Sequence, residues 1–402
     1  EGDVEVLVVN CGGATLKYRL YAMPEEAVLA EGGIDRLGSG AAVVRWKVGA
    51  GARQEVVRPV EDHLAGLRLA LEQIAEVTGD GANLDGVAFK MAHCGAEVPG
   101  AGFVDGRVVA ALERYAAVVP VHNRPLLAAI AAMREALPGL PLTYTVETHF
   151  HTTLEPAAWH YALPAAWHRE HGVRRYGFHS CSHRFVAGRV AELLGRPVEG
   201  LRTVICHLGS GTSVCGVRGG QSVEISSGFT PQSGTPMSTR PGDFDPFVVT
   251  YLAAAEGLGH DELNRVLTAE SGLAGLSGVG GDLRDIRAAA AAGSADAQLA
   301  IDVFVWNIRR WIGSCLMATG GADALAFTGG IGENDARLRA DVCADLGWLG
   351  LRLDPAANDA GDEGLVSAAE SAVAVLTVRT DEEIVVARDA YRLLAGAREA
   401  ER

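Results

Sequence analysis

The sequence feature that most constrains the fold is a pattern of strand, tight turn and strand that occurs twice, about 200 residues apart. Residues 4–21 (VEVLVVNCGGATLKYRLY) and residues 201–220 (LRTVICHLGSGTSVCGVRGG) each contain an apolar strand, a tight turn of small residues and a second alternating strand. Both segments predict β-hairpins. Glycines in such turns let the backbone approach a ligand, and successive N–H groups form a concave anion site. One glycine-containing hairpin is usually only a turn, but two related ones predict two similar domains that face a phosphate chain.

A third glycine-rich segment follows near the C-terminal end. Residues 324–334 (ALAFTGGIGEN) predict a short buried strand that ends in a glycine loop, and residues 335–346 predict a helix. A strand, a glycine loop and a helix N-terminus together suit a nucleotide. The chain has neither a G-x-x-x-x-G-K-[ST] P-loop nor a G-x-G-x-x-G turn after a strand. P-loop and dinucleotide-binding folds are therefore disfavoured.

The composition fits an enzyme rather than a nucleic-acid-binding or membrane protein. The length of 402 residues suggests about two to three domains, and 48% hydrophobic with 21% charged residues allows a large core. A formal charge of −15 opposes non-specific nucleic-acid binding. No apolar run approaches the ~18 residues of a membrane span. The most apolar helix, at residues 303–318, contains Asn307 and two arginines and is expected in the core.

The seven cysteines are scattered and form no Cys-x-x-Cys pair, so neither a disulfide framework nor a zinc ribbon is expected. The first residues lead directly into an expected strand, without the basic and apolar regions of a signal peptide. We therefore expect a cytoplasmic α/β enzyme. Further helices are expected at residues 63–77, 106–117, 124–137, 183–194, 282–291 and 380–396, the last with a threonine cap and an acidic first turn.

Histidines are concentrated in one region, because seven of the twelve lie between residues 149 and 183. The segment from His179 to His183 alternates as a strand or a tight turn does and could be a metal site. A defined zinc site, however, uses separated pairs of ligands. The alternative is that one of these histidines donates a hydrogen bond to a transferring charged group. Packing or surface roles are expected for the others.

Arg240 lies in a glycine- and proline-containing loop at residues 237–246 (MSTRPGDFDP). A guanidinium group presents fixed donors that match carboxylate or phosphate, so Arg240 is a candidate phosphoryl clamp. A surface salt bridge with Asp243 or Asp245 is the alternative.

A further loop, residues 277–285 (SGVGGDLRD), places Asp282 and Arg284 at an expected helix start. The carboxylate could bind a ribose and the guanidinium could stack on a base. The alternative is an ordinary helix cap.

Taken together, these motifs resemble the acetate kinase family, within the superfamily of sugar kinases, actin and heat-shock ATPases. Asn10-Cys11-Gly12-Gly13 with Lys17 is similar to the family's N-x-G-S-S-S-L-K, and residues 174–183 (RRYGFHSCSH) are similar to its R-R-Y-G-F-H-G-T-S-H. The resemblance covers nearly the whole chain. The other motifs follow in the family's order at residues 207–211, 228–231, 239–240, 277–285, 327–334 and 380–383.

The resemblance implies an α/β fold of two actin-like (ribonuclease H-like) domains with the active site in the cleft between them, usually in a homodimer. The N-terminal domain would span residues 1–150 and be completed by a C-terminal helix at residues 385–402. The C-terminal domain, residues 151–384, would carry the nucleotide-binding loops.

The resemblance also implies a role for each matching residue. Asn10 and Glu382 would hold Mg²⁺ (or Mn²⁺), and Lys17 would approach the phosphates of ATP or ADP. His179 and Arg240 would stabilise the γ-phosphoryl group as it passes in line to a carboxylate. Such a transition state leaves the protein little covalent work, so positioning and positive donors carry the rate. The nucleotide would be held by His207, Leu208, Gly209, Ser210, Gly211, Asp282, Leu283, Arg284, Gly330, Ile331, Gly332, Glu333 and Asn334.

Some positions depart from the family's pattern. The arginine of the family's H-R-V-V-H-G-G is Lys90 here, which keeps the charge but loses the bidentate fork. The family's catalytic aspartate is Glu147, one methylene longer, and a displacement of about 1 Å in such a group can cost ~10²-fold in rate. We hypothesise that these two catalytic residues compensate for each other. Ser210 and Ser238 also replace an asparagine and a glycine, which would alter the preference for the phosphoryl donor.

The family's small pocket for the acetate methyl group corresponds to Ala92, Val121, Phe178 and Pro231, with Lys90 at its charged end. Ala92 and Val121 are smaller than the valine and leucine usual there. Each methylene that such a pocket accepts is worth ~1–3 kcal/mol of discrimination. A carboxylate longer than acetate is therefore expected to be accepted at least as well.

The predicted function is reversible, ATP- and Mg²⁺-dependent phosphorylation of a short-chain carboxylate, such as acetate, propionate or butyrate, to an acyl phosphate. Two alternatives remain open at this point. One is a family member that acts on a different acceptor. The other is a catalytically weakened paralogue that binds nucleotide as a sensor or partner-binding protein.

Overall fold

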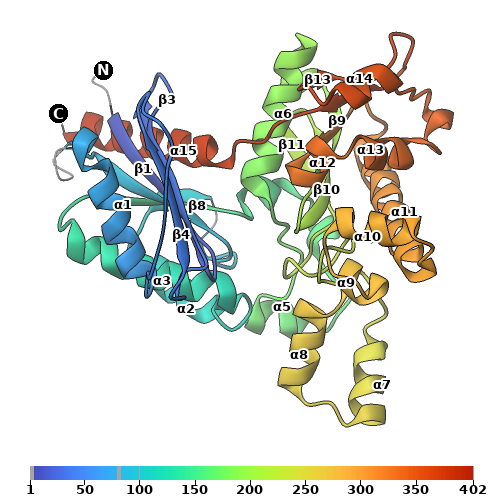
Figure 1. The fold of residues 1–402 in the computed structure, drawn as a ribbon, viewed down its shortest axis with the longest axis horizontal. Helices are drawn as coiled ribbons and strands as arrows, with labels where there is room; N and C mark the ends of the chain where they lie inside the picture. Colours follow the sequence, from blue (N-terminus) through green and yellow to red (C-terminus); the bar gives the residue numbers. More distant parts are fainter. Residues whose placement is uncertain (1–3, 79–82, 99, 402) are drawn as a thin grey trace. The chain divides into compact units, whose positions relative to one another are not determined.

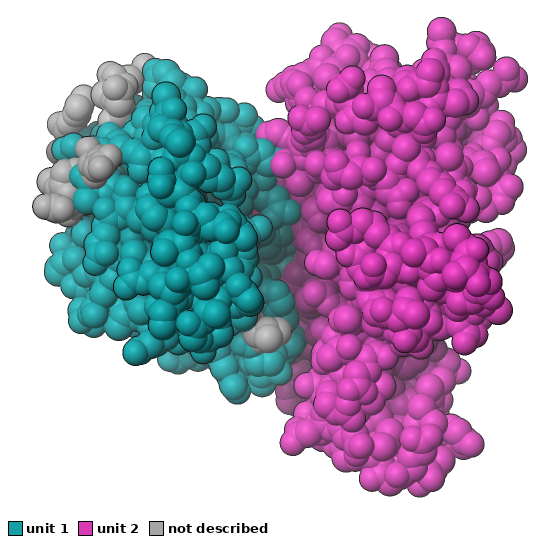
Figure 2. Space-filling view, in the orientation of Figure 1, with its two compact units in different colours: residues 1–149, 381–402 teal, residues 150–380 magenta. Residues whose placement is uncertain are grey.

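Each of the two predicted hairpins forms the centre of a β-sheet. β1 (Val4–Cys11) pairs antiparallel with β2 (Thr15–Met23), and β9 (Arg202–Leu208) pairs antiparallel with β10 (Thr212–Arg218). The sheets belong to the two units into which the chain divides (Figure 2), Glu1–His149 with Asp381–Arg402 (unit 1) and Phe150–Thr380 (unit 2). The structure, a computed structural model, describes residues 4–78, 83–98 and 100–401.

The two sheets share one strand plan (Figure 1). Unit 1 has the order β5-β4-β3-β2-β1-β6-β8-β7, and unit 2 has the order β11-β10-β9-β12-β14-β13. In each, the first hairpin strand pairs in parallel with a later strand, which pairs in parallel with another, beyond which lies an antiparallel edge strand. This confirms the predicted α/β fold class. The remaining strands are β3 (Ala27–Asp35), β4 (Ala42–Val48), β5 (Gln54–Arg58), β6 (Gly86–Met91), β7 (Ala101–Phe103), β8 (Leu142–Val146), β11 (Gln221–Ile225), β12 (Ala324–Thr328), β13 (Gly364–Leu365) and β14 (Ala374–Thr377).

Helices cover both faces of the sheet in unit 1. Leu7 and Val9 of β1 face a core shared with α1 (His63–Thr78), α2 (Gly106–Tyr115) and α3 (Pro120–Ala136). Side chains alternate along a strand, so the intervening residues point to the other face. That face carries α15 (Glu382–Glu401), which packs against β1, β6 and β8. Thr145 of β8 donates a 3.1 Å hydrogen bond to the carboxylate of Asp389 on this helix.

Unit 2 repeats this sandwich of helix, sheet and helix. Val204 and Cys206 of β9 pack with α11 (Ala295–Thr319) on one face. Ile205 packs with α6 (Ser180–Leu194) on the other face. The other helices of this unit are α4 (Pro156–Trp159), α5 (Ala165–His171), η2 (Val198–Gly200), α7 (Phe247–Glu256), α8 (His260–Ala269), α9 (Gly272–Ser277), α10 (Leu283–Ala291), α12 (Gly329–Asn334), α13 (Ala336–Cys343), η3 (Gly347–Leu349) and α14 (Pro355–Ala360), and η1 (His149–Thr153) begins at the end of unit 1.

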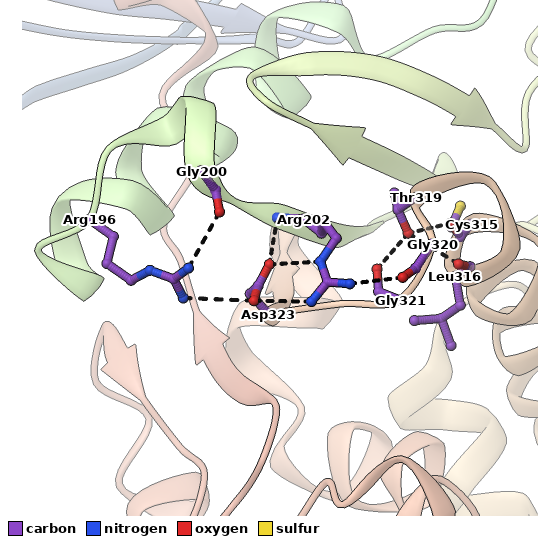
Figure 3. A network of polar contacts seen from close by, with 9 residues as sticks. All are labelled: Arg196, Gly200, Arg202, Cys315, Leu316, Thr319, Gly320, Gly321 and Asp323. Atoms are coloured by element: carbon purple, nitrogen blue, oxygen red, sulfur yellow. Dashed lines mark hydrogen bonds and ion pairs between the residues drawn. The ribbon is translucent and has the colours of Figure 1, made fainter.

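A network of polar contacts closes the end of the unit 2 sheet where β9 and β12 begin (Figure 3). Asp323 accepts hydrogen bonds from the backbone N–H of Arg202 at 2.9 Å and from its Nε at 3.0 Å. Arg196 adds a 3.8 Å ion pair with the same carboxylate, and Arg202 also donates to the carbonyl oxygen of Gly320 at 2.8 Å. These arginines lower the pKa of the Asp323 carboxyl group. The network ties together the strand starts and leaves the opposite strand ends for the glycine loops.

Most of the predicted helices are present, with corrections at three places. Residues 180–183 form the first turn of α6, so the prediction of a strand or tight turn there was wrong. Residues 329–334 form the short helix α12 rather than an open loop. The helix expected from residue 124 begins at Pro120, because proline suits a first helical turn.

Two further predictions from the sequence concern the cysteines and membrane-spanning helices. All seven cysteines are buried free thiols, as expected from their scattered spacing. Across the described ranges, no helix combines the length and the apolar character needed to cross a membrane.

Candidate active site

Three of the predicted site residues of unit 1 lie where parallel strands end. Val9 of β1 is in register with Phe89 of β6, so Asn10 and Lys90 follow at the same level. Glu147 comes directly after β8, and its N–H donates a 2.7 Å hydrogen bond to the carbonyl oxygen of Met91. The carboxyl ends of parallel strands are the usual position of ligand sites in open α/β sheets.

Lys90 joins two carboxylates at this edge. Its Nζ lies 3.5 Å from Glu147 Oε1 and makes a shorter contact with Glu382 Oε2. Side-chain exposures are 16% for Lys90, 10% for Glu147 and 19% for Glu382, so the three charges are largely removed from bulk water. Glu382 is the first residue of α15, on the sheet face to which Lys90 points. Lys90 and Glu147, which we hypothesised to compensate for each other, thus lie within ion-pair distance.

Three other residues of unit 1 were also predicted for the site: Lys17, Ala92 and Val121. Lys17 is exposed on β2 directly opposite Asn10 in the antiparallel register. Ala92 is half-buried just after β6. The side chain of Val121 lies outside the described part of the structure.

In unit 2, the glycine loops predicted to bind nucleotide converge. A Cβ added at Gly329 would lie 2.7 Å from the carbonyl oxygen of Leu208, and one at Gly209 would lie 4.0 Å from the Gly330 nitrogen. Gly329 has φ +78°, which only glycine adopts readily. The turn after β9 and the start of α12 therefore lie backbone against backbone, as a phosphate-binding surface requires.

Two further loops join this surface. The N–H of Ser238 donates a 3.2 Å hydrogen bond to the carbonyl oxygen of Ser210. A Cβ at Gly281 would lie 2.6 Å from the carbonyl oxygen of Ser238, so the loop before α10 packs on the loop of Arg240. The two serines that depart from the family's pattern are thus in contact with each other through their backbones.

Arg240 and His179 point to the same place. A Cβ at Gly211 would lie 3.2 Å from His179 Nε2 and 3.7 Å from Arg240 Nη1. Arg240 Nη1 donates to the carbonyl oxygen of Pro231 at 2.9 Å, and no described carboxylate lies within ion-pair distance of its guanidinium. Burial lowers the pKa of Arg240. A largely buried cation without a carboxylate partner is a strong candidate for binding an anionic ligand.

The alternative interpretation of Arg240 as half of a surface salt bridge is wrong. Asp243 instead pairs with Arg310, at 3.0 Å, and accepts a 2.8 Å hydrogen bond from the N–H of Gly234. The carboxylate of Asp245 accepts from the N–H of Phe247. Both aspartates are therefore used in holding the loop, and the guanidinium of Arg240 is left for another partner.

His179 is held in a strained backbone conformation. Its φ is +59°, in the left-handed region that non-glycine residues rarely occupy, and it directly precedes α6. Its ring stacks on that of His207, with centroids 4.2 Å apart. Strain of this kind persists where the surroundings fix a residue for function.

Phe178 and Pro231, predicted for the acyl pocket, lie near these residues, since Phe178 precedes His179 in the chain and Pro231 contacts Arg240. Phe178 is buried, and its N–H donates to Ser227 Oγ at 2.9 Å. Pro231 is half-buried and supplies the carbonyl oxygen that holds Arg240.

Asp282 forms the cap of α10. It accepts a 2.9 Å hydrogen bond from the backbone N–H of Arg284 and pairs with the Arg284 side chain at 2.6 Å, which lowers the pKa of Asp282 to about 2. The cap interpretation is therefore confirmed. Both side chains remain accessible, and Leu283 between them is buried.

Two residues that support the glycine loops were not found by the sequence analysis in these roles. Glu333 Oε1 accepts from the N–H of Gly329 at 3.0 Å and of Thr380 at 3.2 Å, joining the ends of β12 and β14. The fully buried Arg339 donates from Nη1 to the carbonyl oxygens of Gly332 and Glu333, at 2.9 and 3.0 Å. These contacts fix α12 from behind and depend on tertiary structure, so no local sequence signal would have revealed them. Ile331 and Asn334 lie on the same short helix.

Metal binding by the histidine-rich segment receives no support. In residues 4–78, 83–98 and 100–401, the structure contains no group of three or more His, Cys, Asp or Glu side chains arranged to hold a metal ion. Mg²⁺ is different, because it commonly uses one or two carboxylates together with substrate phosphates and water. Asn10 and Glu382 offer the hard oxygen donors that this chemistry requires.

The comparisons agree on one family. The sequence model of the acetokinase family matches residues 5–388. The chain is 43% identical over 391 residues to the propionate kinase of Escherichia fergusonii, covering 97% of this chain and 96% of that one. It is 44% identical over 397 residues to the acetate kinase of Leifsonia xyli subsp. xyli, covering 97% and 99%. The crystal structure of Porphyromonas gingivalis acetate kinase is similar with a TM-score of 0.88 and 34% identity, covering 97% and 100%.

Proposed function

The chain belongs to the acetokinase family, and we propose that it reversibly transfers the γ-phosphoryl group of ATP to a short-chain carboxylate, forming an acyl phosphate. The observation that carries this proposal in the structure is the anion site of unit 2. His179 Nε2 and Arg240 Nη1 both border Gly211, beside converging glycine loops. Phosphoryl transfer needs this arrangement, because catalysis depends on positioning and on stabilising the charge of the transferring group.

Residues of unit 2 bind the nucleotide phosphates and stabilise the transferring group. The backbone N–H groups of the loops at residues 209–211 and 329–330 bind the nucleotide phosphates. Arg240 and His179 donate to the oxygens of the transferring group and stabilise its charge in the transition state. The acceptor carboxylate is ionised at neutral pH, so it attacks without a general base.

The residues of unit 1 hold the metal and the acceptor. When bound, Mg²⁺ neutralises charge on the β- and γ-phosphate oxygens. Asn10 and Glu382 would hold it, with Lys17 close to the phosphates. Lys90, kept in place by Glu147 and Glu382, would bind the carboxylate acceptor. A requirement for ATP and Mg²⁺ agrees with a cytoplasmic location.

We expect the enzyme to accept propionate at least as well as acetate, because Ala92 and Val121 are smaller residues than the valine and leucine usual at these positions in the family. A hydroxylamine trap for acyl phosphate measures this, with ATP, Mg²⁺ and acids from formate to hexanoate. Ala92→Val should shift the preference back toward acetate by about tenfold, since one methylene is worth ~1–3 kcal/mol. A tenfold or greater preference of the wild type for acetate over every longer acid would contradict the pocket argument. No turnover with any acid would contradict the proposed activity.

We further propose that the protein is a homodimer that buries an apolar stripe on α7. This helix has no buried residue, and Phe247 and Tyr251, one turn apart, are 75% and 70% exposed. Figure 1 shows α7 and α8 extending away from the sheet of unit 2. Exposed apolar surface of this kind commonly marks an interface, and a two-fold axis would pair the stripe with its own copy.

A Phe247→Glu/Tyr251→Glu variant is expected to shift the protein from dimer to monomer, because it places carboxylates in the apolar contact. Light scattering after size-exclusion chromatography measures the mass directly. Val57→Glu is the matched control, because Val57 is 58% exposed on β5 in unit 1. A wild-type monomer, or a dimer that survives both α7 changes, would refute this interface.

A further inference from the structure

A buried chain of hydrogen bonds leads to the back of His179. Ser213 Oγ lies 2.8 Å from His179 Nδ1 and 2.8 Å from His183 Nε2. Ser213 and His183 are both fully buried. The hydroxyl group thus connects the imidazole that borders the anion site with an imidazole that does not border it.

The proton positions along this chain follow from the buried end. Burial lowers the pKa of His183 well below its usual value, and the nearby His151, His207 and His179 lower it further, so the ring is neutral at neutral pH. Its Nδ1 has no hydrogen-bond partner among the described residues. A buried N–H without a partner is rarer than an acceptor atom without one. The single ring proton of His183 is therefore on Nε2, which donates to Ser213.

The hydroxyl group of Ser213 keeps the same donor-to-acceptor direction from His183 to His179. A hydroxyl group has one proton and two lone pairs. One lone pair of Ser213 Oγ accepts from His183, and among the described residues His179 Nδ1 is the acceptor within reach of the proton, so this buried hydroxyl donates to His179 Nδ1. Nδ1 of a neutral His179 is then an acceptor, and the ring carries its proton on Nε2. That nitrogen borders Gly211 and Arg240.

We propose that His183 and Ser213 are positioning residues that hold His179 in the Nε2–H tautomer, so that its neutral ring donates a hydrogen bond to the phosphoryl group. The proposal rests on the proposed function for the identity of the acceptor, but the tautomer itself does not depend on that function. The opposite tautomer would turn a lone pair toward an anion.

The histidines packed around His179 have hydrogen-bond partners of their own. From β9, the ring of His207 stacks on His179 and directs its own Nδ1 at Ser182 Oγ, 2.7 Å away. From η1, His151 is bonded through Nδ1 to Ser222 Oγ and through Nε2 to the carbonyl oxygen of Phe178. Arg240, from the loop before α7, is the cation on the anion side of the ring.

The tautomers can be observed directly in the full-length protein by ¹⁵N NMR of labelled histidine side chains between pH 6 and 8. Long-range couplings distinguish a protonated ring nitrogen from an unprotonated one, and His179→Gln and His183→Gln spectra assign the signals. We expect Nε2–H for both rings in the wild type. We expect Ser213→Ala to give His179 a mixture of tautomers. Ser222→Ala is the matched control, because it removes a buried hydroxyl bonded to His151 and Cys215, neither of which belongs to the His183–Ser213–His179 chain.

The same variants separate positioning from a structural role in activity. Ser213→Ala and His183→Leu should lower kcat by about 10- to 100-fold with KM within about twofold, a smaller loss than the ~10⁴-fold that a wrong tautomer costs a serine protease. His183→Gln should retain kcat within about threefold, because its amide nitrogen can donate from the position of Nε2. Wild-type His179 protonated on Nδ1, or tautomers unchanged in Ser213→Ala, would overturn the proposal. An inactive wild type with the expected tautomers would count against the proposed function and leave the relay standing.

Discussion

Arg240→Ala is expected to form acyl phosphate at least ~10³-fold more slowly than the wild type, because arginines that stabilise phosphoryl transfer are worth 10³–10⁵ in kcat. The guanidinium is largely buried, bordered by Gly211 and the carbonyl oxygen of Pro231, and no described carboxylate neutralises it. Its charge is therefore available to the transition state. The loss should fall mainly on kcat, and the hydroxylamine assay at saturating ATP and carboxylate measures it.

Two further variants make this test specific. Arg240→Lys should recover only part of the lost rate, because an ammonium group keeps the charge without the planar fork. Arg310→Ala is the matched control, since it removes an arginine that pairs with Asp243 on the same loop. An Arg240→Ala enzyme within tenfold of the wild type, or an equal loss in Arg310→Ala, would show that the guanidinium does not act on the transferring group.

Glu382→Gln is expected to lower kcat at least ~10²-fold, the scale of losing one preorganised electrostatic group in an active site. The change removes a negative oxygen ligand from the proposed Mg²⁺ site. It also removes one of the two carboxylates that position Lys90. The Mg²⁺ concentration for half-maximal rate should rise, and a titration of initial rate against Mg²⁺ at fixed ATP measures both effects.

Glu383→Gln provides the control for this variant. It makes the same charge change one residue further along the first turn of α15. It should stay within about threefold of the wild type. If both variants lose activity equally, or if Glu382→Gln keeps its Mg²⁺ requirement unchanged, Glu382 does not hold the metal.

The fold could be predicted largely from local pattern. The apolar strands of β1 and β9, each followed by a turn of small residues, predicted both central hairpins and their repetition. Those signals are short-range, because strand alternation and turn chemistry act over a few residues. The prediction was wrong at residues 180–183. The four-residue spacing of His179 and His183 fits one turn of helix as well as it fits a strand, so the spacing did not distinguish the two.

The sequence predicted the separate motifs of the site, but it did not predict which of their residues contact one another. The pairing of Lys90 with Glu147 was a hypothesis that only distances could support, since Lys90 is on β6 and Glu147 follows β8. Ser213, Glu333 and Arg339 act through contacts with loops distant in sequence. Such support depends on tertiary packing, which residue type and spacing do not encode locally.

The packing of α15 onto the sheet of unit 1 has a consequence for biosynthesis. Unit 2 is a single continuous segment, whereas unit 1 needs residues on both sides of it. The ribosome therefore finishes all of unit 2 before it makes the helix that covers β1, β6 and β8. Domains commonly fold as the nascent chain emerges, from the N-terminus onward. In this chain the strands of unit 1 are made first, and one apolar face of their sheet stays uncovered until α15 is made. Glu382 can therefore contact Lys90 only after α15 has packed on that face.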